Sequence, residues 1–195
     1  MKNLQLIAQA YTFAKEIGVT VLDGKKAERK EYYIRKNANG FGAGQKQLVD
    51  ANLNEEVGVT NFENKGMLPA GKDLLVTGLK ISYAPVADAV AKTARYGQDN
   101  GNVNFVNGEI KIEQDGVLLR LPIKAVSVSS NNDNYHLEGD QYYEVAPFMI
   151  KSGKTFGISV EPVGAIAVEA CFEIALDTIE LSESAKVAAS ASRSC

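Results

Sequence analysis

The chain has 195 residues, 45% of them hydrophobic and 23% charged, with a formal net charge of −3. This composition is typical of a globular protein, and the length suits one domain with extensions. The acidic balance argues against a nucleic-acid-binding surface over the whole molecule, because such surfaces are basic. The only dense basic run, GKKAERK at 24–30, is interpreted as a solvated turn.

Neither the first residues nor the cysteines indicate secretion. Gln5 and Gln9 interrupt the apolar residues at the start, so we expect no secretory signal. No apolar run approaches the ~20 residues that cross a bilayer. Cys171 and Cys195 are too few for a disulfide framework, and we expect both to be free thiols in a reducing compartment.

Residues 2–17 form the clearest helix pattern of the chain. The helical wheel has one broad apolar arc, made of Leu4, Leu6, Ile7, Ala10, Tyr11, Phe13, Ala14 and Ile17. This arc fits packing on the chain's own domain or docking on a partner. The polar arc carries few lysines, so a protein partner fits better than a lipid surface. The candidate partner contacts are Leu4, Ile7, Tyr11 and Phe13.

The residues after this helix suggest an N-terminal arm that extends to residue 50. Residues 31–37 are compatible with a short strand, and the glycine-rich stretch 37–47 is interpreted as a flexible link. The main domain is predicted over 51–181, and residues 182–195 form a predicted flexible tail without periodicity.

From about Val57 the pattern becomes that of β-strands separated by turn-forming clusters. Extended segments are predicted at 57–63, 73–84, 108–123, 125–129, 142–150 and 155–163. The exception is 85–97, where an initial proline and several alanines predict a short helical insertion.

The sharpest local signal lies in GEIKIEQDGVLLRLPI at 108–123. Asp115 and Gly116 separate two alternating runs and tolerate the positive φ angles of a type I′ turn. A hairpin turning there pairs Gln114 with Val117, Ile112 with Leu119 and Ile110 with Leu121. One face of this hairpin is apolar and has to be buried.

The segment 165–181 could be read as a helix or as a strand, and the positions of its apolar residues favour the strand. In a strand, one side is apolar from Ile166 to Leu176, whereas a helix would scatter the same residues around its axis. Period two therefore predicts a long or bulged strand. About eight strands without alternating helices predict an all-β fold, namely a sandwich of two antiparallel sheets. A single jelly roll or another Greek-key sandwich fits this pattern best.

Residues that carry chemistry are scarce. His136 is the single histidine, no nucleophile elbow occurs, and we expect no catalytic residue, metal site or cofactor. The loop 129–140 is rich in side-chain oxygens but does not match the EF-hand calcium pattern. A bound cation in this loop stays open, and we expect no enzyme and no small-molecule substrate.

The order of the segments resembles that of jelly-roll capsid proteins of tailless icosahedral bacteriophages. The likeness covers about residues 56–180: VTNF…LPAGKDLLVTGLKI, a hairpin ending in Leu121-Pro122, then Pro147, Ile150 and Gly153, and a long closing strand. Many phages of this kind with an internal membrane use a far longer double jelly roll. This chain has the length of one.

The resemblance implies a structural virion protein, either a major capsid or a vertex (penton) subunit. Its partners are then copies of itself and other capsid proteins, and its arm contacts a neighbour, an internal membrane or the genome. The implied location is the virion capsid, assembled in the host cytoplasm. The alternatives are a capsid decoration or spike protein and a carbohydrate-binding, lectin-like module, for which Tyr135, Tyr142 and Tyr143 are the aromatic cluster.

Overall fold

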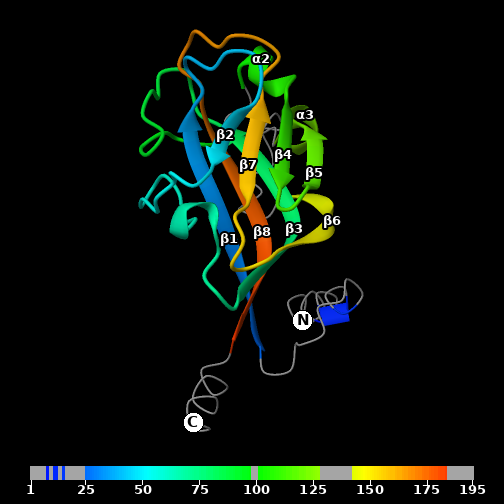
Figure 1. Ribbon diagram of the computed structural model, residues 1–195. Coiled ribbons are helices and arrows are strands. Elements are labelled where there is room, and N and C mark those ends of the chain that lie inside the picture. The colour runs from blue at the N-terminus through cyan, green and yellow to red at the C-terminus, as the bar shows by residue number, and fades with distance from the viewer. Residues whose placement is uncertain are drawn as a thin grey trace, which may run out of the picture.

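The computed structural model describes residues 25–97, 101–127 and 142–183, together with Ala8, Tyr11, Thr12 and Lys15. Two four-stranded sheets pack face to face (Figure 1). Sheet A has the order β1 (Lys25–Asn37), β8 (Cys171–Glu183), β3 (Lys72–Tyr83), β6 (Tyr143–Ile150). Sheet B has the order β2 (Lys46–Val49), β7 (Gly157–Glu161), β4 (Glu109–Glu113), β5 (Val117–Pro122). All pairings between these eight strands are antiparallel, so the predicted all-β sandwich is confirmed.

The core lies between the two sheets and is built from alternate residues of each strand. In β8, Phe172, Ile174 and Leu176 are buried among the inward side chains of both layers, as the period-two pattern predicts. β4 contributes Ile110 and Ile112, both fully buried. The short helices η1 (Asn64–Gly66), α2 (Val103–Val106) and α3 (Ile123–Val126) lie outside the sheets.

The hairpin is present, with a longer turn than predicted. Ile110 pairs with Leu121 and Ile112 with Leu119, as expected. Val117, however, pairs with Glu113 across a register shift. Asp115 and Gly116 have positive φ angles of 56° and 145°, and the amide of Gln114 donates to the Gly116 carbonyl. Gln114 is the extra residue of this turn. Its side chain forms two hydrogen bonds with the backbone of Lys151, at 2.7 and 2.9 Å, which hold it in place.

The predictions for residues 24–47 are wrong in two places. The basic run is the first half of β1, where its charges face the acidic strand β8: Arg29 bonds Asp177, and Lys30 lies 3.5 Å from Glu180. The glycine-rich stretch is not a link to an arm. It joins β1 of sheet A to β2 of sheet B, so the sheets begin at Lys25 rather than near residue 51.

Two further segments differ from their predicted structure. Residues 85–97 form turns instead of a helix, because the Asp88 carboxylate accepts hydrogen bonds from the backbone and guanidinium of Arg95, a local alternative to helical bonds. The strand predicted at 125–129 is not formed at its start, because residues 123–126 form α3; residues 128 and 129 lie outside the described ranges. The spacing within α3 suits a helical turn, since Ile123 and Val126 lie three residues apart and both reach the core.

The strand predicted at 57–63 is absent, and the closing strand is shorter than expected. Residues 57–63 belong to neither sheet; they run beside β1, with the Arg35 amide bonded to the Val59 carbonyl at 2.8 Å. The closing strand begins at Cys171, and the preceding residues form a loop in which Val168 is exposed. The tail beyond Glu183 lies outside the described residues.

Candidate functional site

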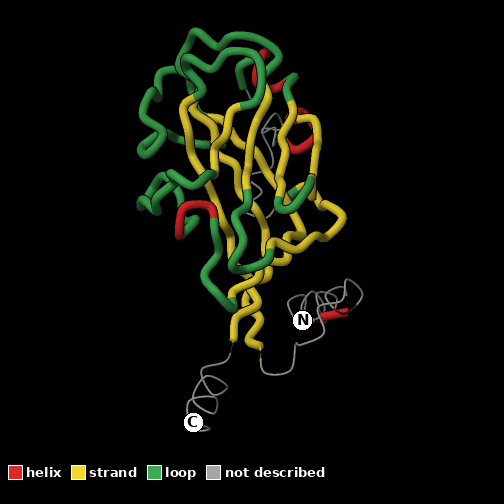
Figure 2. The backbone as a smooth tube through the Cα atoms, in the orientation of Figure 1, coloured by secondary structure: helices red, strands yellow, loops and turns green. Residues whose placement is uncertain are grey.

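One end of the sandwich is made of three connecting loops, which we call the loop end. It comprises residues 38–45, 162–170 and, from the third loop, the described residues 84–97 and 101–108, and it lies opposite the end where β1 begins and β8 finishes (Figure 2). Hydrogen bonds join the loops: Gly40 donates its amide to the Ile166 carbonyl at 2.9 Å, and Ile166 returns a bond to Phe41 at 2.8 Å. Two loops that are remote in sequence therefore hold each other in place.

Polar side chains fasten the third loop to the other two. The Asn104 side chain donates to the Ala165 carbonyl at 2.8 Å, and the Val163 amide donates to the Asn104 carbonyl at 3.0 Å. On the opposite side, the Asn37 amide group donates to the Ala89 carbonyl at 2.8 Å. This interlocking presents a defined surface to solvent, since loops held by several backbone bonds keep one shape.

Exposed valines gather on this end. Nine large hydrophobic side chains are exposed among the described residues, and five of them lie on the loop end. These five are exposed by 47–66%: Val86, Val90, Val103, Val163 and Val168. Single exposed apolar residues are ordinary, but a group on one interlocked surface is typical of an interaction site.

A cavity of about 200 Å³ opens between the loops beside Val86 and Val168. Its floor is aromatic, formed by Tyr83, Phe105 and Phe172. Burial raises the pKa of Tyr83 to about 12, and its hydroxyl lies 2.6 Å from that of Ser127, so this group stays neutral at physiological pH. The cavity therefore suits an apolar side chain better than a charged ligand.

Cys171 lines the same cavity, and we expect it to be unreactive. It is a free cysteine, 1% exposed, and burial raises its thiol pKa, with the Glu169 and Asp88 carboxylates adding to the shift. Because the thiolate is the reactive form, a Cys195→Ser variant should not react with a thiol reagent at neutral pH until urea unfolds it. The check is the release of the chromophore from an aromatic disulfide reagent; fast reaction of the folded variant would contradict this assignment.

The outer face of sheet A carries a ladder of ion pairs across its strands. Arg29 of β1 bonds both oxygens of Asp177 on β8 at 2.8 and 2.9 Å, and Arg35 bonds Glu173 at 2.7 Å. Between them, the Lys80 ammonium of β3 lies 3.3 Å from Glu31. Asp177 and Glu173 of β8 are thus each paired with an arginine of β1 on this face.

The aromatic residues considered for sugar binding do not form a common platform in the part of the chain that the structure describes. Tyr142 lies across Gly78 on sheet A, where its hydroxyl bonds Glu31, and burial raises its pKa. Tyr143 is the next residue and stands on the other face of the strand, 45% exposed. Tyr135 lies outside the described residues.

Most of the other residues singled out from the sequence also lie outside the described ranges. These are Leu4, Ile7, Phe13, His136, Cys195 and the whole loop 129–140. Tyr11 is described: it is helical and half-buried, and helical Thr12 and Lys15 are exposed. No group of three or more metal-ligating side chains occurs among the described residues.

Sequence reasoning missed the loop end. Val86 and Val90 lie in a segment predicted as a helix, and Val163 and Val168 in segments predicted as strands. Val103 lies outside every predicted segment, so no alternation marked these valines as exposed. The clusters of Asn and Gly around 101–108 were the available signal, since such residues build interlocked turns.

Within the described ranges, none of the helices has both the length and the apolar character that crossing a membrane requires.

Comparison with known proteins gives no relative from which a role for these residues follows. No protein-family model matches the chain, and no curated protein matches it.

Proposed function

We propose that this chain is a structural subunit of an icosahedral phage shell, with a jelly-roll fold and self-association through the loop end. The pairing of strands supports the jelly roll. β1 pairs with β8, β2 with β7, β3 with β6 and β4 with β5. This is the nesting expected of one long hairpin, turned at Asp115-Gly116 and wrapped into two sheets, as in eight-stranded jelly rolls.

The five exposed valines of the loop end are the observation that supports self-association most directly. A shell subunit has to present apolar surface to copies of itself, and that surface has to keep its shape so that every copy meets its neighbour alike. The hydrogen bonds between the three loops supply the rigidity, and the cavity beside Val86 and Val168 offers a recess for an apolar side chain. Cyclic capsomers need this kind of surface.

The same proposal includes the partners and the location. Copies of this chain and other capsid proteins are the partners, and the virion is the place where they meet. A major subunit and a vertex subunit both fit the size of one sandwich. A decoration or spike protein would instead form small oligomers and no closed shell.

The test compares charged substitutions at matched valines. Val103→Asp combined with Val163→Asp places two charges on the loop end, and we expect the assemblies formed by the purified full chain to be lost. Desolvating a carboxylate in an interface is unfavourable, whereas the same groups are harmless in a free subunit. Sedimentation and electron microscopy measure the assemblies, and thermal unfolding checks that the fold is kept.

Val117→Asp is the control, because Val117 is similarly exposed, by 58%, and lies at the turn of the β4–β5 hairpin away from the loop end. This variant should assemble like the unmodified chain. A chain that stays monomeric at every concentration would contradict the shell role. Assembly that tolerates both loop-end charges would contradict the assigned surface but leave the shell role standing.

A further inference from the structure

The outer face of sheet A has an apolar group near the end where β1 begins and β8 finishes. We call it the outer patch; it consists of Ala27, Leu75, Met149, Ile179 and Leu181. Their position follows from strand alternation, because Leu74 and Val76 point into the core and Leu75 between them points outward. Leu75 pairs with Ile179 on one side and with Met149 on the other, so the patch crosses neighbouring strands.

The outer patch is covered. Leu75, Met149, Ile179 and Leu181 are each exposed by 1–6%, the range of the core between the sheets. In the described part of the chain, the hydrophobic side chains that pack with them are one another and Ala27. A fully buried residue is surrounded on all sides, and neighbours within one sheet close only its flanks. Neighbours within sheet A therefore do not by themselves account for exposures this low.

We infer that the amphipathic N-terminal stretch of the same chain, residues 2–17, lies over this face. Its sequence has a continuous apolar arc, which is the surface that a sheet face of this kind accepts. The exposure of the described positions agrees: Tyr11, on the apolar arc, is half-buried, whereas Thr12 and Lys15, on the polar arc, are exposed. Helices of this length are marginal in water and need such packing to form.

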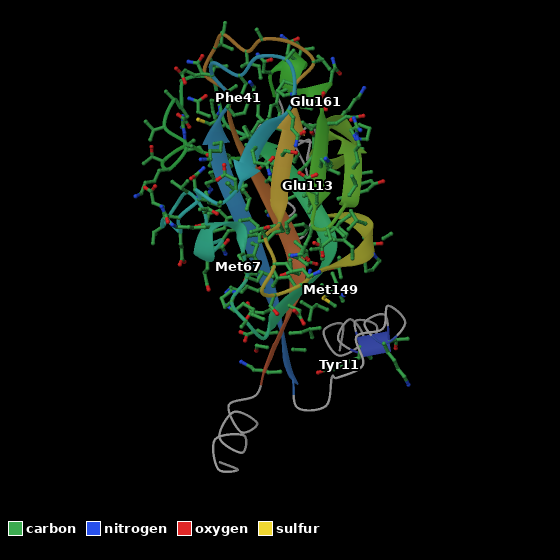
Figure 3. All side chains as sticks on the ribbon, in the orientation of Figure 1. Tyr11, Phe41, Met67, Glu113, Met149 and Glu161 are labelled. Carbon is green, nitrogen blue, oxygen red and sulfur yellow. The ribbon has the colours of Figure 1, made fainter. Side chains whose placement is uncertain are left out.

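Chain connectivity and size fit this occupant. β1 begins at Lys25, two residues before the patch residue Ala27, and the residues 18–24 that lead into it span up to ~25 Å when extended. A helix over 2–17 is ~24 Å long, and four paired strands are ~15 Å across, so one helix crosses the whole patch. Tyr11 lies toward the same end of the molecule as Met149 (Figure 3).

The role of this contact goes beyond shell building, because it makes residues 2–17 part of the folded subunit. Packing on the chain's own sheet leaves the arm's apolar arc covered in the free protein. The partner contacts assigned to Leu4, Ile7, Tyr11 and Phe13 are then internal contacts, and the neighbour meets the polar arc instead.

Tryptophan fluorescence tests the inference in the full chain, which contains no tryptophan of its own. We expect Tyr11→Trp to emit at shorter wavelength than Thr12→Trp and to be quenched several-fold less by acrylamide. Thr12→Trp is the matched control, one residue further along the same helix but on the polar arc. Phe13→Trp, also on the apolar arc, replaces Tyr11→Trp if that variant does not fold.

A substitution on the sheet identifies the patch as the contact. Adding Met149→Glu should shift the Tyr11→Trp emission to longer wavelength and leave Thr12→Trp unchanged. Dilution should change neither spectrum, because the contact lies within one chain. Equal quenching of the two tryptophans, no response to Met149→Glu, or a long-wavelength shift on dilution, which would indicate a second copy as the occupant, would each overturn the inference. None of these outcomes depends on whether shells form.

Discussion

Replacing Phe172 by alanine should lower the free energy of unfolding by about 3–5 kcal/mol, the usual cost of removing a large aromatic side chain from a packed core. Phe172 is 1% exposed, and its ring centroid lies 4.4 Å from that of Phe105 and 6.4 Å from that of Phe41. These three rings come from β8, α2 and the loop between β1 and β2. The substitution thus leaves a cavity and also removes the anchor of two loops at the loop end.

Urea unfolding followed by far-UV circular dichroism measures this loss at a concentration where the chain is not assembled. Tyr143→Ala is the control, since that ring is 45% exposed and most surface substitutions change stability by less than about 0.5 kcal/mol. A loss below about 1 kcal/mol for Phe172→Ala would contradict the assigned packing, because core truncations that small occur only where the site collapses fully. We also expect weaker self-association of the variant than its stability alone explains.

Secondary structure is predictable from the sequence wherever the local pattern alone determines it. The hairpin at Asp115-Gly116 combines alternation with turn chemistry, and both strands lie where predicted. β8 obeys period two over Cys171–Leu176, which decided between strand and helix. For such elements the local pattern and the tertiary environment agree, which is why the all-β sandwich was predictable.

The failures are places where a distant segment decides the local structure. The basic residues of Lys25–Lys30 disfavour a strand when the segment is considered alone. They become favourable once the acidic strand β8, about 150 residues later, lies beside them. The glycine-rich stretch 37–47 lacks periodicity because its order comes from hydrogen bonds to residues 162–170. Neither partner is visible in a short window, which is why the sequence alone predicts both segments to lie in an arm.

The loop end could not be predicted for a related reason. Val86 and Val90 lie in a segment whose alanines favour a helix, and in a helix they would be candidates for burial. Their exposure follows from the turns that Asp88 and Arg95 stabilise. An interaction surface made of loops depends on such long-range and side-chain-specific bonds, whereas a core depends mainly on periodicity.

The ladder on sheet A gives the second large expected effect. Replacing Arg35 by alanine should lower the free energy of unfolding by about 2–4 kcal/mol, because it leaves the buried carboxylate of Glu173 without its cation. The guanidinium is also stacked between the rings of Tyr33 and Tyr96, at 4.8 and 5.0 Å. Its removal therefore also loosens residues 85–97 from the outer face of the sheet.

A double-mutant cycle separates these contributions. Removing Glu173 together with Arg35 leaves no unpaired buried charge, so the double variant Arg35→Ala/Glu173→Ala should lose less stability than the two single losses combined. Lys26→Ala breaks an ion pair with Glu28 in which both side chains are largely exposed, and it should leave the unfolding midpoint unchanged. Urea unfolding of the two single variants, the double variant and Lys26→Ala measures these changes in the free energy of unfolding. Strict additivity of the two losses would mean that Arg35 stabilises the sheet through its stacking on Tyr33 and Tyr96 and not through the ion pair.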